Sequence, residues 1–94
     1  MSDAASAECT AVIVNRKGLH ARAAAKLVAL ASRFDARVEV SRNELVANGQ
    51  SIMGLMMLAA ARHSIVTLSA TGPEARSAVE ALAGLIAAGF YEQD

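Results

Sequence analysis

The spacing of apolar residues changes several times along this chain of 94 residues. Short stretches that are rich in β-branched residues, or apolar at every second position, predict strands at 9–14, 36–42, 44–49 and 64–70. Longer stretches with apolar residues three or four positions apart predict helices at 21–34, 51–60 and 74–88. The predicted order of elements is therefore β-α-β-β-α-β-α.

This order favours an α+β fold, because strands joined across helices, together with one hairpin, can share a single sheet. We expect a two-layer open-faced sandwich, in which three helices cover one face of a four-stranded antiparallel sheet. The length suits one domain over residues 1–94. The small and polar residues 1–7, and residues 89–94 after the last helix, are predicted to be flexible ends.

Composition excludes several classes of protein. A formal net charge of zero and an aromatic content of 3% argue against nucleic-acid binding. Cys9 is the only cysteine, so the chain can form neither an intrachain disulfide nor a zinc site built on cysteines. The first residues do not resemble a signal peptide, and no apolar run approaches the ~20 residues that cross a bilayer. We expect a cytoplasmic protein without membrane insertion.

His20 lies between Gly18-Leu19 and the helix predicted to begin at Ala21. The first turn of a helix presents unpaired N–H groups and a partial positive charge, which favour a bound phosphate and an uncharged imidazole. A neutral ring has a free lone pair and is a nucleophile near neutral pH. A phosphoryl group on this ring would meet the first-turn amides of Ala21, Arg22 and Ala23, and the Arg22 guanidinium. The simpler interpretation is that His20 only caps the helix.

Two further features of the sequence have simpler interpretations as well. Arg22, Lys26 and Arg33 fall on one side of the predicted helix, which carries no acidic residue before Asp35. Such a basic stripe is most often a solvated face. The second histidine, His63, lacks a preceding glycine and a following helix, so we expect it in a surface loop.

Ser51 is predicted to be the N-cap of the second helix. On a helical wheel Leu55, Leu58 and Ala59 fall on one side of that helix, and the opposite side carries four large apolar residues: Ile52, Met53, Met56 and Met57. The second apolar side is either an exposed docking patch or the methionine filling of a fully buried helix. A phosphate on Ser51 would add about two negative charges beside that patch, although a plain N-cap serine is the simpler interpretation.

Two stretches of the sequence, "NRKGLHARAAAKLV" and "NGQSIMGLMMLAA", resemble the histidine-containing phosphocarrier protein family, HPr, of the bacterial sugar phosphotransferase system. The first is similar to the active-site pattern G-[LI]-H-A-R-P-A, and the second to the regulatory pattern K-S-I-M-G-[VL]-M. The resemblance extends from about Cys9 to Ala88, and the order of elements also fits the family.

The resemblance implies a phosphoryl carrier rather than an enzyme with its own turnover, acting as a monomer. His20 would accept phosphate on Nδ1 from enzyme I, which uses phosphoenolpyruvate, and would pass it to enzyme IIA-type domains. Arg22 would neutralise the phosphate, and Ser51 would be a target of HPr kinase/phosphorylase. Partners would contact the basic face, with Lys26 and Arg33, and the apolar residues Ile52, Met53 and Met56. No metal or organic cofactor is implied for this chain.

The sequence departs from the family patterns at two places. Ala23 stands where the family has proline, and Gln50 stands where a lysine usually precedes the regulatory serine. These departures leave open a nitrogen-related regulatory branch of the system in place of sugar uptake. The residues alone also leave two other functional classes open. One is a small-molecule-binding regulatory module, and the other is a pure interaction domain.

Overall fold

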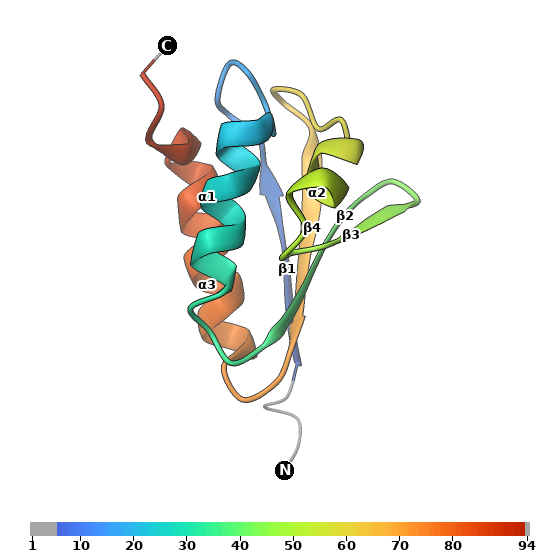
Figure 1. Cartoon of the computed structure of the whole chain (residues 1–94), viewed down its shortest axis with the longest axis vertical. Coiled ribbons are helices and arrows are strands. Elements are labelled where there is room, and N and C mark those ends of the chain that lie inside the picture. The colour runs from blue at the N-terminus through green and yellow to red at the C-terminus, as the bar shows by residue number, and fades with distance from the viewer. Residues whose placement is uncertain (1–5, 94) are drawn as a thin grey trace.

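The strands and helices occur in the predicted order in the computed structural model, which describes residues 6–93 (Figure 1). The four strands are β1 (Ser6–Val12), β2 (Arg37–Arg42), β3 (Leu45–Asn48) and β4 (Ile65–Thr71). The helices are α1 (Ala21–Ala31), α2 (Ile52–Met57) and α3 (Ala75–Ala87), and a short 3-10 turn, η2, follows at Gly89–Tyr91. The β-α-β-β-α-β-α prediction is confirmed.

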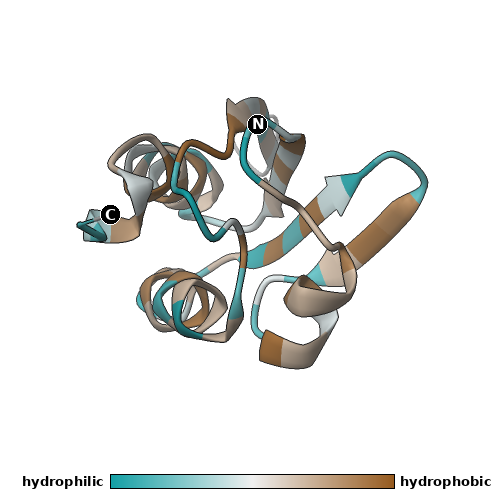
Figure 2. Cartoon of the chain, turned by 90° about the horizontal axis from the view of Figure 1, so that it is seen from above, coloured by the Kyte–Doolittle hydropathy of each residue, from teal (hydrophilic) through white to brown (hydrophobic). Residues whose placement is uncertain are grey.

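The sheet has the strand order β1-β4-β2-β3, and all neighbouring strands are antiparallel. Val12 pairs with Ile65 at one end of β1, and Glu39 of β2 pairs with both Ser69 and Asn48. Viewed along the helices, the three helices lie on one side of the sheet (Figure 2). The predicted two-layer open-faced sandwich is therefore confirmed.

The core fills the space between the sheet and the helices. Alternate residues of β2 and β4 point inward and are buried, and they are Val38, Val40, Val66, Leu68 and Ala70. The spacing of apolar residues also predicts which residues of the helices and their caps face the core, and those fully buried are Ala24, Leu27, Ala31, Leu55, Leu58, Ala78, Val79, Leu82 and Ile86. Val28 and Phe34 belong to the same pattern and are partly buried. Ala59 was predicted to share the buried side of α2, but it is exposed and has a φ of 51° beyond the end of that helix.

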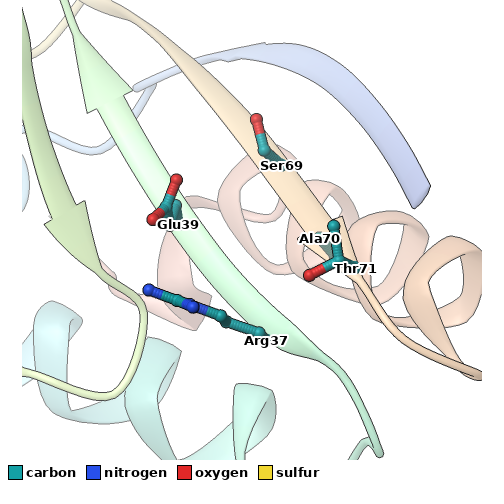
Figure 3. A pocket seen from close by; sticks show the side chains of 5 residues that line it. All are labelled: Arg37, Glu39, Ser69, Ala70 and Thr71. Carbon is teal, nitrogen blue, oxygen red and sulfur yellow. The ribbon is translucent and has the colours of Figure 1, made fainter. Parts of the chain in front are cut away.

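The open face of the sheet carries polar side chains that alternate with the core residues. Arg37 and Glu39 of β2 lie beside Thr71 and Ser69 of β4, and they line a shallow hollow of about 290 Å³ (Figure 3). This hollow contains none of the residues predicted to carry function.

Both predicted ends need correction. Ser6 and Ala7 belong to β1, and the prediction for residues 1–5 lies outside the described residues. A flexible end over 89–94 is not what the structure has at residues 89–91, because Phe90 is fully buried and Gly89–Tyr91 forms a turn, and residue 94 lies outside the described residues. Burial of an aromatic side chain is worth roughly 2 to 3 kcal/mol, which is enough to hold this segment against the domain. In Figure 1 the C-terminal segment lies at the same end of the molecule as the start of α1.

Candidate functional site

The loop that carries His20 is fixed by Gly18. Gly18 has a φ of +68°, and a Cβ at this position would lie 2.5 Å from the carbonyl oxygen of Ala60. The next residue, Leu19, donates its N–H to that same carbonyl at 2.9 Å. Glycine is therefore required both for the left-handed backbone and for the close approach to the segment that follows α2.

His20 is the N-cap residue of α1. Its backbone is extended, and its carbonyl accepts the first helical hydrogen bond from Ala24 at 2.8 Å. Nδ1 of the ring accepts from the N–H of Arg22 at 3.3 Å, which is long for a hydrogen bond. The ring thus caps the helix, as the simpler interpretation predicts, and it also places Nδ1 beside a first-turn amide, as the phosphate interpretation requires.

The other ring nitrogen of His20 contacts a residue that the sequence analysis did not identify. Nε2 is hydrogen bonded to Oε2 of Glu92, and the two side chains are 27% and 13% exposed, respectively. The second carboxylate oxygen of Glu92 accepts from Nδ2 of Asn15 at 3.0 Å. Asn15 is buried, and the same Nδ2 donates to the carbonyl of Gly18 at 2.8 Å. One carboxylate therefore joins the His20 ring to the loop that precedes it.

Glu92 is held in its ionised form. Partial burial by itself raises the pKa of this carboxyl group, but the hydrogen bonds from Asn15 and His20, together with the positive charge of Lys26, lower the pKa below its ordinary value of 4.5. The carboxylate is consequently charged at neutral pH. A charged carboxylate beside Nε2 favours the proton on that nitrogen and leaves the lone pair on Nδ1.

The pocket around His20 is open and basic. It has a volume of about 670 Å³, and its lining includes the basic residues Lys17, Arg22 and Lys26 together with Tyr91 and Glu92. Lys26 also donates its Nζ hydrogen to the carbonyl oxygen of Phe90. Lysine and arginine side chains around a nucleophilic ring can attract and neutralise an incoming anion.

The predicted residues are not all in the same place. Arg22 lines the His20 pocket, whereas Arg33, just beyond the other end of α1, lines a groove that shares only Lys26 and Tyr91 with that pocket. Ala21 and Arg22 are exposed, but Ala23 is fully buried. Solvent therefore reaches only the first two of the three residues whose amides were predicted to bind phosphate.

The short helix α2 has the N-cap and the exposed side that the sequence predicts. Oγ of Ser51 accepts from the N–H of Gly54 at 2.9 Å. Met53 and Met57 are 71% and 74% exposed, and Ile52 and Met56 are exposed as well. The interpretation of this helix as fully buried is therefore wrong, and we refer to these four residues as the methionine patch.

The end of α2 lies beside the His20 loop. A shallow hollow of about 240 Å³ is lined by Lys17, Leu19 and His20 together with residues 59–61, which follow α2. A protein that covered the His20 pocket would therefore also reach toward α2. His63, in contrast, is an exposed residue of a turn with a φ of 78°, which agrees with its predicted place in a surface loop.

Sequence reasoning missed several residues of the described site, among them Asn15, Lys17, Tyr91 and Glu92. A signal was present for Glu92, because Phe90 is one of only three aromatic residues in the chain and an aromatic residue after a helix is usually packed. Within residues 6–93, no group of three or more His, Cys, Asp or Glu side chains is arranged to hold a metal ion. No helix in that range is both long and apolar enough to cross a bilayer.

Comparisons of the sequence with known proteins all find phosphocarrier proteins of one family. The model of a family described as the PTS HPr component phosphorylation site matches residues 7–88. The chain is 51% identical over 80 residues to phosphocarrier protein HPr of Cupriavidus necator, which covers 85% of this chain and 90% of that protein. It is 42% identical over 80 residues to phosphocarrier protein NPr of Shewanella violacea, with 85% and 88% covered.

Solved structures agree with these sequence relatives. The crystal structure of HPr-C-His from Thermoanaerobacter tengcongensis superposes with a TM-score of 0.88 at 40% identity. The match covers 94% of this chain and 99% of that chain.

Proposed function

This chain belongs to the HPr family of phosphocarriers of the phosphotransferase system, and from this premise we propose that Nδ1 of His20 is the atom that carries the phosphoryl group. The observation that carries the proposal is the position of this ring. Nδ1 faces the amide of Arg22 at the start of α1, in a pocket lined by three basic side chains. The family pattern aligns a histidine with this position, since "GLHAR" is shared with it.

The proposed donor is the phosphohistidine of enzyme I, and the proposed acceptors are enzyme IIA-type domains. In each transfer the phosphoryl group passes between two imidazole rings, so that one N–P bond breaks as another forms. Little covalent chemistry is left for the carrier, and the rate depends on positioning and on neutralisation of phosphate charge. The side chains of Arg22, Lys17 and Lys26 are arranged to supply that neutralisation. The chain acts in this scheme as a cytoplasmic monomer that partner enzymes phosphorylate and dephosphorylate.

The methionine patch is the proposed contact surface for these partners. Ile52, Met53 and Met56 are exposed, and the end of their helix adjoins the His20 loop. Methionine side chains adapt to differently shaped surfaces, which suits a carrier that meets a donor and several acceptors in turn. Arg33 extends the proposed surface along α1 toward acidic groups of a partner.

Ser51 is the proposed regulatory site, as a target of an HPr kinase/phosphorylase. Its Oγ accepts from the N–H of Gly54 at the beginning of α2, immediately before the methionine patch. A phosphate at this N-cap position is compatible with the helix, because the positive end of the helix dipole favours it. The same phosphate places negative charge beside an apolar contact surface and opposes docking there.

Incubation with enzyme I, Mg²⁺ and phosphoenolpyruvate tests the proposal. We expect the wild-type chain to gain one phosphoryl group that is lost in acid and stable in base. His20→Ala should gain none, and His63→Ala, in which the other histidine is removed, should be labelled like wild type. Absence of label in the wild type would favour a ligand-binding or interaction module.

The relative named HPr is more similar to this chain than the relative named NPr is, which favours the general carrier over the nitrogen-related branch. Transfer rates to a sugar-specific and to a nitrogen-related enzyme IIA domain, measured side by side, distinguish the two branches.

A further inference from the structure

The contact between Glu92 and His20 bears on the phosphoryl-transfer reaction. We propose that Glu92 is a positioning residue, which fixes the His20 proton on Nε2 and balances the charge that the ring acquires when Nδ1 is phosphorylated. This inference rests on the proposed function, because it assigns a role in the reaction of the same ring.

The two ring contacts agree on one arrangement of protons. Nδ1 accepts from the N–H of Arg22, so it must carry a lone pair, and Nε2 faces a carboxylate, which can only accept. A single neutral tautomer, with the proton on Nε2, satisfies both contacts. The opposite tautomer would place two hydrogens against each other at Nδ1 and two acceptors against each other at Nε2. Glu92 therefore selects the form of His20 in which Nδ1 is the nucleophile.

The same carboxylate acts on the product. When the Nδ1 lone pair forms a bond to phosphorus, the N–P bond of a phosphoramidate donor breaks and its electron pair stays on the donor nitrogen. The proton on Nε2 of His20 is retained, so the ring becomes positively charged. Glu92, which is ionised at neutral pH, lies against the nitrogen that holds this proton. An ion pair that forms as the reaction proceeds stabilises the later states more than the starting state.

The backbone near Glu92 is built to hold it in place. Gly89, Phe90 and Tyr91 all have positive φ, at 65°, 57° and 58°. Such a run costs free energy for residues with a side chain, roughly 1 to 2 kcal/mol each. It is offset by complete burial of Phe90 and by the bond from Lys26 to the Phe90 carbonyl. Strained backbone that is retained beside a reactive ring is typical of functional sites.

Asn15 holds the Glu92 carboxylate through its second oxygen. Its Nδ2 donates at once to Glu92 and to the carbonyl of Gly18, two residues before His20. The carboxylate is thus oriented by a buried amide, and the ring is oriented by the carboxylate. In a serine protease, too, a carboxylate orients the catalytic histidine and fixes its tautomer.

The test compares wild type with Glu92→Gln and Glu92→Ala, and with Glu80→Gln as a matched control on the exposed surface of α3, where Glu80 is 70% exposed. Nitrogen-15 NMR of the ring reports which nitrogen carries the proton. Phosphorylation by potassium phosphoramidate, a small donor that needs no docking, reports the reactivity of Nδ1 apart from partner binding. Melting by circular dichroism shows whether each variant is folded.

We expect the two Glu92 variants to shift ring protonation toward Nδ1 and to react about tenfold more slowly with phosphoramidate. Glu80→Gln should match wild type in both measurements. Unchanged nitrogen shifts with rates within twofold of wild type would overturn the proposal. A faster reaction would overturn it too, since it would mean that the carboxylate repels the incoming group. Labelling of wild type by enzyme I decides the proposed function separately, whatever the variants do.

Discussion

Glu92 contacts the imidazole of His20, from which it is separated by 72 positions in the sequence. The turn at Gly89–Tyr91 brings the end of the described chain back over the start of α1, so that two distant segments enclose one ring. Which ring nitrogen of His20 is reactive therefore depends on the packing of the C-terminal turn as much as on the local motif.

Arg22→Ala should slow phosphoryl transfer from enzyme I by about tenfold or more, because a guanidinium in the His20 pocket is lost where phosphate charge must be neutralised. Arg22 is exposed, so the melting temperature should change little. Arg33→Ala, just beyond the C-terminal end of α1, is the matched control. It lies outside the pocket and should leave the reaction with phosphoramidate unchanged. Equal transfer rates for wild type and Arg22→Ala would remove the assigned role.

Ser51→Asp should weaken binding to enzyme I about tenfold, or about 1.4 kcal/mol, while the thermal melt stays close to that of wild type. Aspartate also caps helices well, and its charge lies beside the methionine patch. Ser51→Ala separates the two effects, because it removes the cap bond to Gly54 at a cost of about 1 kcal/mol without adding charge. Titration calorimetry measures the binding. If Ser51→Asp binds as tightly as wild type, the proposed regulation by phosphate fails.

Gly18→Ala should lower the free energy of unfolding by about 1 to 3 kcal/mol and should also slow phosphoryl transfer. The new Cβ would collide with the Ala60 carbonyl, so the loop that carries His20 must shift. Gly84→Ala is a suitable control, since a Cβ at that position of α3 would meet nothing beyond its own stretch of helix within 4 Å. Alanine there should stabilise the helix by about 1 kcal/mol. Chemical denaturation that showed no loss for Gly18→Ala would contradict the geometry of the loop.

The free energy of unfolding should decrease as the pH is lowered through the acid range, and Glu92 should account for part of that decrease. The pKa of this carboxyl group in the folded state lies below its ordinary value of 4.5, so the folded state favours the ionised form. The stabilisation is complete above pH 4.5, decreases as the pH falls below that value, and is lost once the pH falls through the lower pKa of the folded state. Glu92→Gln should therefore flatten the pH dependence of the free energy of unfolding in this range. Parallel curves for the two proteins would contradict it.

Much of the fold could be predicted from the sequence, because its strands and helices have clear apolar periods. The alternation of Val38 and Val40 with polar neighbours indicates the inward side of β2, and Leu55 and Leu58 indicate that of α2, and each of these side chains is buried. The N-cap at Ser51 was evident from its side chain and position. Local chemistry of this kind depends on near neighbours, which a sequence displays directly.

Only the residues of the site that are close to His20 in the sequence could be predicted. His20 and Arg22 belong to one short motif, but Glu92 reaches His20 only because Phe90 is buried and the backbone turns back through three positive φ angles. Positive φ is not expected for phenylalanine or tyrosine, so no propensity rule predicts this turn. The burial of Ala23 likewise depends on how α1 packs against neighbouring elements such as α2 and α3, which one sequence does not specify.

The identity of the phosphorylated atom tests the central claim most directly. The chain, labelled with nitrogen-15 in its histidine rings, is phosphorylated by enzyme I and phosphoenolpyruvate and then examined by phosphorus and nitrogen NMR. We predict coupling between phosphorus and Nδ1 of His20, with Nε2 protonated against Glu92. Coupling to Nε2, or phosphate on any residue other than His20, would contradict the account.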